Sequence, residues 1–236
     1  MKQGGLMRGL SHWFAPSCVL CDAVSDAPVS LCIACQQDLP WLLHACQRCS
    51  LPLDNTERAV CAKCQREPPV SDSVTCILHY ATPVDFLIKR MKFGHQLSYA
   101  KVLGYLLAQQ LRQSSALLPD AILPVPLHDA RLRERGFNQT LEIYRELRRT
   151  LNIPLLTSVT RAHRTQAQSL LSAEQRVENI RDVFAVKAGA SLPAHIVILD
   201  DVVTTGATSN ELSRVLKAAG VSRVSVWAIA RATPRE

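Results

Sequence analysis

Hydrophobic and polar residues alternate with two different periods along most of the chain after Pro69. Three segments repeat apolar residues every three to four positions, as on one face of an amphipathic helix: residues 84–91, 99–111 and 139–151. Four short apolar runs are typical of buried strands: residues 73–80, 121–125, 195–199 and 223–230. A last helix is predicted over residues 209–219, because Gly220 follows at a position where helices often end. Strands separated by helices predict an α/β fold with a mostly parallel sheet and flanking helices.

The first part of the chain lacks this alternation. The sequence Glu67-Pro68-Pro69 is typical of a linker, so we expect a small domain over residues 1–69 and an α/β domain over residues 70–236. A chain of 236 residues is too short for a large multidomain enzyme. It contains no apolar run of about 18 residues and no secretion signal at its start. We therefore expect no membrane insertion and a cytoplasmic location.

Eight of the nine cysteines form four C-x-x-C pairs in the first 69 residues. The pairs are Cys18/Cys21, Cys32/Cys35, Cys46/Cys49 and Cys61/Cys64. Each pair can place two thiolates on one tight knuckle, and two knuckles complete a tetrahedral zinc site. The sequence therefore predicts two zinc ions (Zn²⁺) in a small double zinc-ribbon domain. Successive knuckles could pair, or the first could pair with the third in a cross-brace, and the sequence allows both.

Two other uses of these cysteines fit less well. Disulfides are disfavoured in a reducing cytosol, and thioredoxin-like redox pairs need a βαβ context that this part of the chain lacks. A closed site of four cysteines has no open position for a substrate, so the zinc ions would hold the fold together instead of performing chemistry. The ninth cysteine, Cys76, lies in an apolar run and is predicted to be a small buried hydrophobe.

The excess positive charge lies outside the cysteine-rich part. The net charge is +7, yet residues 1–70 hold six basic and six acidic side chains. Residues 89–149 hold eleven basic and five acidic side chains. Such a concentration favours an anionic partner, a nucleotide or a nucleic acid, although a solvated basic helix face has the same composition.

The densest group of candidate functional residues follows the apolar run 195–199. Asp200 and Asp201 come first, and a turn of small and hydroxyl-bearing residues follows: Thr204, Thr205, Gly206, Ala207 and Thr208. Backbone N–H groups, threonine hydroxyls and the positive end of a helix can together surround one phosphate, while carboxylates accept hydrogen bonds from sugar hydroxyls. The block predicts a site for a ribose 5-phosphate. It matches neither the P-loop nor the dinucleotide-binding pattern.

This block resembles the signature of the type I phosphoribosyltransferases, which bind phosphoribosyl pyrophosphate (PRPP). Further segments are similar to the ComF/GntX family, whose members join an amino-terminal zinc ribbon to a PRPP-binding domain. These segments are the four knuckles and residues 89–94, 124–127, 133–139, 161–168 and 176–179, in the order expected for the family. The resemblance covers nearly the whole chain. It implies a type I phosphoribosyltransferase-like sheet preceded by a small zinc-ribbon domain.

The resemblance also implies roles for individual residues. The segment 126–135 would be a loop that holds the pyrophosphate, through Pro126, Leu127, Arg131 and Arg135. A mobile hood would contain Arg161, Arg164, Thr165 and Gln168. The catalytic candidates are Asp200 and Asp201, which would grip the ribose hydroxyls while Mg²⁺ carried by PRPP offsets the charge of the leaving pyrophosphate. Purine-salvage enzymes of this fold commonly carry a third acid where this chain has Thr204, which disfavours hypoxanthine or guanine salvage.

Three classes of function stay open. By its resemblance, the protein would be an accessory factor that handles incoming single-stranded DNA, together with DNA-uptake or recombination machinery. It could instead be a working phosphoribosyltransferase of nucleotide metabolism, or a PRPP-sensing regulator that binds specific duplex DNA or RNA. The candidate nucleic-acid contacts are Lys89, Arg90, Lys92 and Arg133, with Phe93 and Phe137 as the nearest aromatic side chains on which bases could stack.

Overall fold

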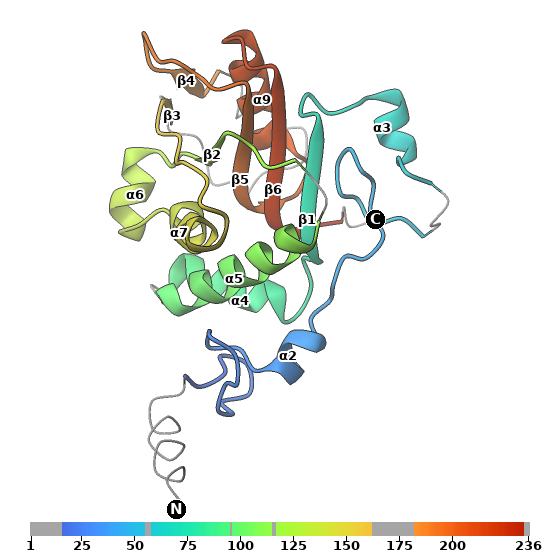
Figure 1. The fold of residues 1–236 in the computed structure, drawn as a ribbon, viewed down its shortest axis with the longest axis vertical. Helices are drawn as coiled ribbons and strands as arrows, with labels where there is room; N and C mark the ends of the chain where they lie inside the picture. Colours follow the sequence, from blue (N-terminus) through green and yellow to red (C-terminus); the bar gives the residue numbers. More distant parts are fainter. Residues whose placement is uncertain (1–15, 55–57, 95, 115–116, 162–181, 234–236) are drawn as a thin grey trace, which may run out of the picture.

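The centre of the fold is a four-stranded sheet in the order β1-β6-β5-β2 (Figure 1). The computed structural model describes residues 16–54, 58–94, 96–114, 117–161 and 182–233. The strands of the sheet are β1 (Ser73–His79), β2 (Ala121–Pro124), β5 (His195–Val203) and β6 (Arg223–Arg231). Each of the three strand pairings is parallel. The predicted mostly parallel sheet is thereby confirmed.

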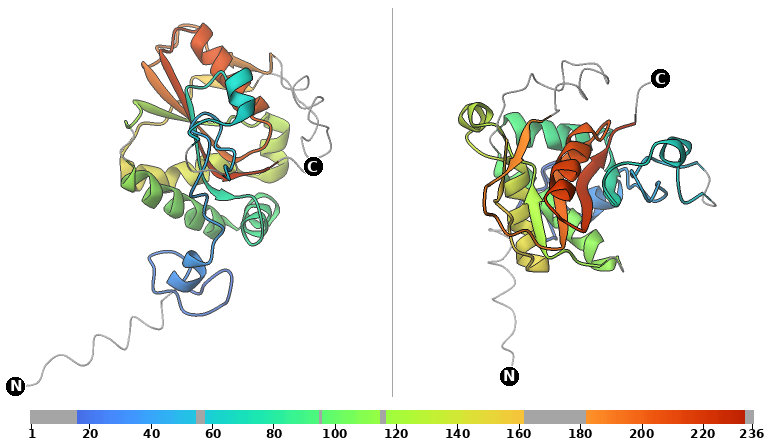
Figure 2. Two further views of the ribbon diagram at one scale, coloured as in Figure 1. Left: turned by 90° about the vertical axis from the view of Figure 1, so that its right-hand side faces the viewer. Right: turned by 90° about the horizontal axis from the view of Figure 1, so that it is seen from above.

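Helices cover both faces of this sheet (Figure 2). One face packs against α4 (Val84–Phe93), α5 (Leu97–Gln113) and α7 (Gln139–Leu151). The other face packs against α9 (Ala207–Ala218). Because both faces are buried, the strands are continuous apolar runs instead of alternating ones. This arrangement explains why the apolar runs alone located the strands.

The structure changes the bounds of two predicted elements beside the acidic pair. The strand predicted over residues 195–199 continues to Val203, because its parallel pairing with β6 goes on through Asp200 and Val202. The acidic pair thus lies within β5. The helix predicted from residue 209 begins at Ala207, directly after Gly206, whose φ of 82° is in the left-handed region. Strand and helix are therefore joined by a very short turn.

The predicted pyrophosphate loop is mostly helical. Residues 129–135 form α6 (Asp129–Arg135), and the Nδ1 of His128 caps its start by accepting the Ala130 N–H at 3.1 Å. The helix ends at Gly136, which has a φ of 76°. The expectation of a loop at these positions was wrong, because seven residues with a side-chain cap and a terminal glycine are enough for two helical turns.

An antiparallel pair of short strands flanks the segment predicted to be the hood. These strands are β3 (Val159–Arg161) and β4 (Phe184–Val186), with Val159 opposite Val186. Arg161, the first of the predicted hood residues, is the last residue of β3 and lies opposite Phe184. The predicted hood residues Arg164, Thr165 and Gln168 lie outside the described residues.

The cysteine-rich part forms two small lobes at different places on the α/β unit (Figure 1). The first lobe contains α2 (Ile33–Gln37) and packs with Leu31 and Leu39 into the core of α4 and α5. The second contains α3 (Ala62–Arg66) and lies beside β1. The boundary predicted at residues 69 and 70 falls between α3 and β1. In the described part of the chain, no helix has both the length and the apolar character needed to cross a membrane.

Candidate functional site

The eight paired cysteines form two separate clusters of sulfur atoms. The first cluster contains Cys18, Cys21, Cys32 and Cys35, and the second contains Cys46, Cys49, Cys61 and Cys64. Within each cluster the sulfur atoms all lie within 4.8 Å of one another. Successive knuckles therefore pair, and the arrangement is not a cross-brace.

The spacing of the sulfur atoms fits a tetrahedral zinc ion. Four sulfurs at the usual Zn–S distance of about 2.3 Å lie about 3.8 Å from one another. The Sγ atoms of Cys21 and Cys32 are 3.8 Å apart, and those of Cys49 and Cys61 are 3.7 Å apart. The Cys61 N–H also donates to the Sγ of Cys46 at 3.3 Å, a bond that favours a thiolate. Both clusters thus have the donor set and the spacing that zinc requires.

The ionisation of the thiols shows why each cluster needs a cation. Burial opposes ionisation of Cys18 and Cys46, but backbone N–H donors overcome it and lower the pKa of Cys18 to about 6 and that of Cys46 to about 7. In contrast, burial and the neighbouring sulfurs raise the pKa of Cys35 and Cys64. One thiolate forms readily in each cluster, whereas the fourth requires a bound cation to offset the negative charge.

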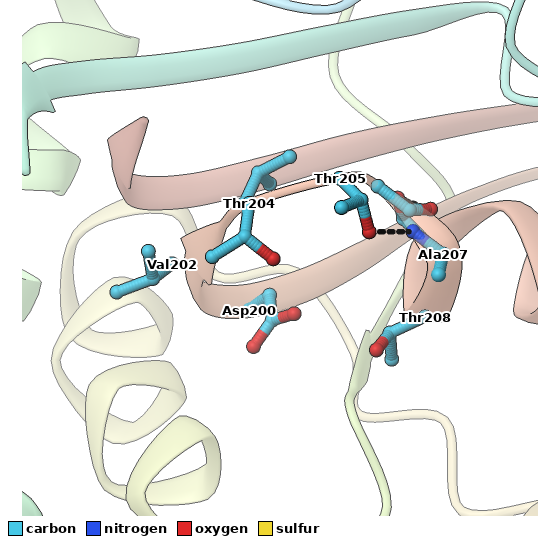
Figure 3. Close-up of a pocket in the computed structure, with 9 residues that line it drawn as sticks. Asp200, Val202, Thr204, Thr205, Ala207 and Thr208 are labelled. Carbon is cyan, nitrogen blue, oxygen red and sulfur yellow. Dashed lines mark hydrogen bonds between the residues drawn. The ribbon is translucent and has the colours of Figure 1, made fainter. Parts of the chain in front are cut away.

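The predicted ribose phosphate site is a pocket between the end of β5 and the start of α9 (Figure 3). Residues 202–209 and the Asp200 carboxylate line it. The hydroxyls of Thr204 and Thr208 and the Asp200 carboxylate point toward the same space. Thr205 Oγ1 accepts the Ala207 N–H at 3.3 Å and so fixes the turn. The pocket combines hydroxyl donors and a helix N-terminus, both suited to a phosphate, with a carboxylate suited to a sugar hydroxyl.

The two carboxylates have different surroundings. Burial, together with the charge of Asp201, raises the pKa of Asp200 to about 7. The Asp201 side chain is only 5% exposed, and the Lys92 ammonium contacts both of its oxygens, at 2.9 and 2.8 Å. Lys92 was predicted to contact nucleic acid. The structure instead turns it inward, from the end of α4 onto the acidic pair.

Arginines from two other elements reach the same place. On α6, Arg131 and Arg135 are four residues apart and share one helix face, whereas Arg133 is exposed. Burial lowers the pKa of Arg135, with the charge of Asp201 opposing this shift and that of Arg131 adding to it. Burial and Arg131 lower the pKa of Arg161 to about 10, against the charge of Asp200. The acidic pair thus contacts Lys92 of α4 and interacts electrostatically with Arg135 of α6 and Arg161 of β3.

Sequence reasoning did not place two residues, Lys92 and Arg231, beside the pocket. Lys92 lies in a segment that sequence reasoning singled out, but nothing in the sequence links it to Asp201, which is 109 positions further along the chain. Arg231 ends the apolar strand β6 and is only 7% exposed. Its guanidinium donates to the carbonyls of Val203 and Thr204, at the start of the turn. In the sequence, the only indication of a special role for Arg231 is that a charged residue ends an apolar strand.

Comparison with known proteins agrees with this two-part organisation. Residues 10–65 match the family described as the double zinc ribbon domain. Competence protein F of Haemophilus influenzae is 33% identical over 231 residues, which cover 94% of this chain and 100% of that protein. The chain belongs to the ComF family. This ComF protein therefore joins a zinc ribbon with two structural zinc sites to an α/β unit with a parallel sheet.

Other relatives match the ComF protein over most of its length. DNA utilization protein YhgH of Escherichia coli K12 is 33% identical over 209 residues, 85% of this chain and 90% of that protein. Competence protein ComFC of Streptococcus pneumoniae is 25% identical over 173 residues, 72% of this chain and 74% of that protein. Adenine phosphoribosyltransferase from Leishmania tarentolae superposes with a TM-score of 0.39 and 17% identity, over 70% of this chain and 78% of that chain.

Proposed function

We propose that this ComF protein binds PRPP in the pocket at the end of β5. The observation that carries the proposal is the convergence of an anion-binding turn, an acidic pair and several cations on one place. PRPP contains a 5-phosphate, two ribose hydroxyls and a pyrophosphate, and each needs a different partner. The turn at residues 204–208 suits the phosphate, Asp200 and Asp201 suit the hydroxyls, and the arginines suit the pyrophosphate.

The path of the chain supports this assignment. β2 ends at Pro124, and residues 125–128 lead directly into α6, so Pro126 and Leu127 lie between the sheet and the arginines. The Asn138 side chain holds this connection by donating to the Val125 carbonyl at 3.1 Å. Arg131 and Arg135 are thereby placed by a short segment that begins at the carboxyl end of a strand. Ligands of parallel α/β sheets usually bind at that end.

Mg²⁺ would enter with PRPP, held by ligand oxygens and water next to the acidic pair, and would offset part of the pyrophosphate charge. The remaining work falls to residues of the chain. Asp200 and Asp201 orient the ribose, and Arg131 and Arg135 hold the pyrophosphate. If an acceptor attacks the anomeric carbon, the bond to the pyrophosphate oxygen breaks, and the carboxylates stabilise the positive charge that develops on the ribose. By the resemblance to type I phosphoribosyltransferases, Thr204 stands where purine-salvage enzymes commonly have an acid, so we propose neither hypoxanthine nor guanine as the acceptor.

We further propose that single-stranded DNA is a partner, in DNA uptake or DNA utilisation. Relatives of this chain are named competence protein and DNA utilization protein. In the structure, α4 presents Phe86, Lys89, Arg90 and Phe93 to solvent. These residues follow the spacing i, i+3, i+4, i+7, which places them along one helix face. We call these four residues the α4 strip.

The α4 strip combines the two properties that single-stranded nucleic acids require. Phe86 and Phe93 are 40% and 73% exposed, so both rings are accessible to bases. The Arg90 guanidinium lies 5.2 Å from the ring centre of Phe86, and that of Arg135 lies 5.5 Å from the ring centre of Phe93. Cations beside exposed rings can contact the phosphates of a strand whose bases stack on the rings. The exposed Arg133 of α6 adds another cation, whereas Phe137 is partly buried.

Calorimetric titration tests the PRPP proposal directly. The purified protein should bind PRPP in the presence of Mg²⁺, and the double change Asp200→Asn with Asp201→Asn should abolish binding. The change Asp182→Asn is the matched control, because that carboxylate is 79% exposed and lies on the loop before β4. Equal binding by the parent and the double variant would show that the acidic pair is not the ribose site.

Fluorescence anisotropy with labelled oligothymidylate tests the DNA proposal. Log affinity should fall with log salt concentration, with a slope near −0.7 for each phosphate neutralised. Lys89→Gln with Arg90→Gln should reduce that slope, and Phe86→Leu with Phe93→Leu should weaken binding at every salt concentration. Arg145→Gln with Arg149→Gln removes the same charge from exposed positions of α7 and should change little. If PRPP binds but DNA does not, a phosphoribosyltransferase in nucleotide metabolism becomes the better proposal.

A further inference from the structure

Arg231 is a buried cation that is held by backbone carbonyls. The residue is 7% exposed and lies at the end of β6. Its guanidinium donates to the carbonyls of Cys49 and Val203, each at 2.9 Å, to that of Ala232 at 2.6 Å, and to that of Thr204. A buried charge of this kind is costly to place unless its donors are satisfied. Here the accepting carbonyls come from two distant parts of the chain, Cys49 on one side and Val203 and Thr204 on the other.

These carbonyls belong to two different functional parts of the molecule. Cys49 is a ligand of the second cysteine cluster. Val203 and Thr204 connect the acidic pair to the turn that lines the phosphate pocket. The guanidinium is planar and its donors have fixed directions, so the carbonyls that accept from it are held at fixed positions relative to one another. Arg231 therefore connects the Cys46/Cys49 knuckle of the second zinc site to the candidate phosphate turn.

The Cys46/Cys49 knuckle is itself fixed on the sheet. The Ser50 hydroxyl donates to the Val74 carbonyl at 2.8 Å and accepts the Cys76 N–H at 3.0 Å, so it pairs with the edge strand β1. Ser50 has a φ of 54°, in the left-handed region, and it follows directly after the metal ligand Cys49. The Ser50 N–H donates to the Cys46 carbonyl at 2.8 Å, so Ser50 is part of the turn that this knuckle forms. A knuckle without its metal would therefore lose both the Ser50 and the Arg231 contacts.

The first cysteine cluster has a different environment. Its described contacts to the α/β unit are mainly apolar, through Leu31 and Leu39, which pack with the core of α4 and α5. The Trp41 backbone continues along β1, where it pairs with Leu78. In the described part of the chain, these contacts lead to α4, α5 and β1, and none of the hydrogen bonds of the first cluster reaches residues 203–208. The two zinc sites are thus unequal in their relation to the pocket.

We propose that Arg231 is a positioning residue through which the second zinc site holds the phosphate turn in its ligand-binding form. The proposal rests on the proposed PRPP site. It assigns the second zinc site a role in ligand binding and the first zinc site a role in local folding alone. Removing either metal should therefore have different consequences for PRPP, although each loss removes one zinc ion.

Matched cysteine variants test this inequality. Cys64→Ser and Cys21→Ser should each lower the zinc content from two ions to one, as measured by elemental analysis. Cys64→Ser should weaken PRPP binding by about tenfold or more, the loss expected when a buried hydrogen-bonding contact to the turn is broken. Cys21→Ser should leave the PRPP affinity within about twofold of the parent. Equal weakening by both variants would overturn the proposal.

Arg231→Lys tests the connecting side chain itself. The variant keeps the charge and the eight paired cysteines, so it should retain two zinc ions. It loses the planar donors of the guanidinium and should therefore bind PRPP about tenfold more weakly. Hydrogen exchange at the amides of residues 203–208 should rise in Arg231→Lys and in Cys64→Ser, and should stay unchanged in Cys21→Ser. Unchanged exchange and unchanged affinity in Arg231→Lys would overturn the proposal. If that variant does not fold, the comparison of the two cysteine variants decides.

The same experiments separate this proposal from the proposed function. If the parent protein does not bind PRPP, the proposed ligand is wrong. The hydrogen exchange of residues 203–208 still reports whether the second zinc site and Arg231 hold the turn. A rise in Cys64→Ser and Arg231→Lys without a rise in Cys21→Ser would then support the connection, and an equal response of all three variants would refute it.

Discussion

Asp200 is a residue at which ligand binding and stability oppose each other. Burial, together with the charge of Asp201, raises its pKa to about 7 in the folded protein, whereas an unfolded chain has a pKa of about 3.9. Between these two values the folded state keeps a proton that the unfolded state has released. The free energy of unfolding therefore falls as pH rises through this window. The carboxylate proposed to bind ribose hydroxyls thus makes the ligand-free protein less stable at neutral pH.

Asp200→Asn should stabilise the ligand-free protein at pH 8 and abolish stabilisation by PRPP. The amide keeps the oxygen that accepts the Asp201 N–H at 2.8 Å, but it removes the buried charge. The gain in melting temperature should shrink as pH falls toward 4 and vanish below the unfolded-state pKa, where the parent residue carries a proton in both states. Each kcal/mol corresponds to about 2–4 °C for a chain of this size, so differential scanning fluorimetry across this pH range measures it. A variant that is less stable than the parent at pH 8 would contradict the prediction.

Two lysines of α4 provide a second comparison between single residues. Lys92 contacts the Asp201 carboxylate, which is 5% exposed, while Lys89 pairs with Asp85 at the surface and is itself 60% exposed. Removing one partner of a buried pair leaves a charge without its counter-ion, at a cost of about 3–5 kcal/mol. An exposed pair contributes about 0–1 kcal/mol.

Lys92→Met should therefore lower the free energy of unfolding by several times more than Lys89→Met. Urea denaturation at pH 7.5, followed by circular dichroism, measures both values. The two variants remove the same charge from the same helix. The difference between their free energies of unfolding therefore reports how far the buried Asp201 depends on its counter-ion, compared with the surface residue Asp85. Equal losses would mean that water or another cation replaces Lys92 at Asp201.

At the scale of elements, α6 shows where sequence reasoning reaches its limit. The residues of α6 have no apolar periodicity, since none of its side chains is fully buried and the partly buried ones include Arg131 and Arg135. A pattern search relies on that periodicity and therefore misses such a helix. The capping residues His128 and Gly136 mark its ends, but without apolar periodicity between them they do not predict a helix. The strands of the buried sheet were predictable for the opposite reason, because each is a continuous apolar run.

The helical form of α6 makes its three arginines unequal. Arg131 and Arg135 share one face, and Arg133 is exposed away from it. Arg131→Gln and Arg135→Gln should each weaken PRPP binding about tenfold, because charge-assisted contacts to phosphate are lost. Arg133→Gln should leave PRPP affinity unchanged and reduce the affinity for single-stranded DNA. Calorimetry and anisotropy on the same three variants measure this, and similar effects of all three on PRPP would indicate an extended loop in solution.

The organisation of the whole molecule was predictable only in part. The knuckle spacing of the cysteines predicted two zinc sites, and the structure pairs successive knuckles. The places where the lobes dock were not predictable, because they depend on a few single side chains. Ser50 and Arg231 connect the second lobe to β1, β5 and β6, and both contacts span long distances in sequence. Such contacts leave no periodic pattern in the chain.

The metal content of the whole molecule should depend on pH in a defined direction. Protein purified without chelators should carry two zinc ions per chain at pH 7.5, because zinc binds thiolates. As pH falls, protons compete for the sulfurs and zinc should leave, with loss of structure in lobes too small to have their own core. The lowered pKa of Cys18 and Cys46 means that these sulfurs should be among the last to take up protons. Zinc release followed with a metal-sensitive dye, alongside circular dichroism, measures both events. A folded protein that contains iron, or that has four disulfides by mass spectrometry in place of metal, would contradict the assignment of structural zinc.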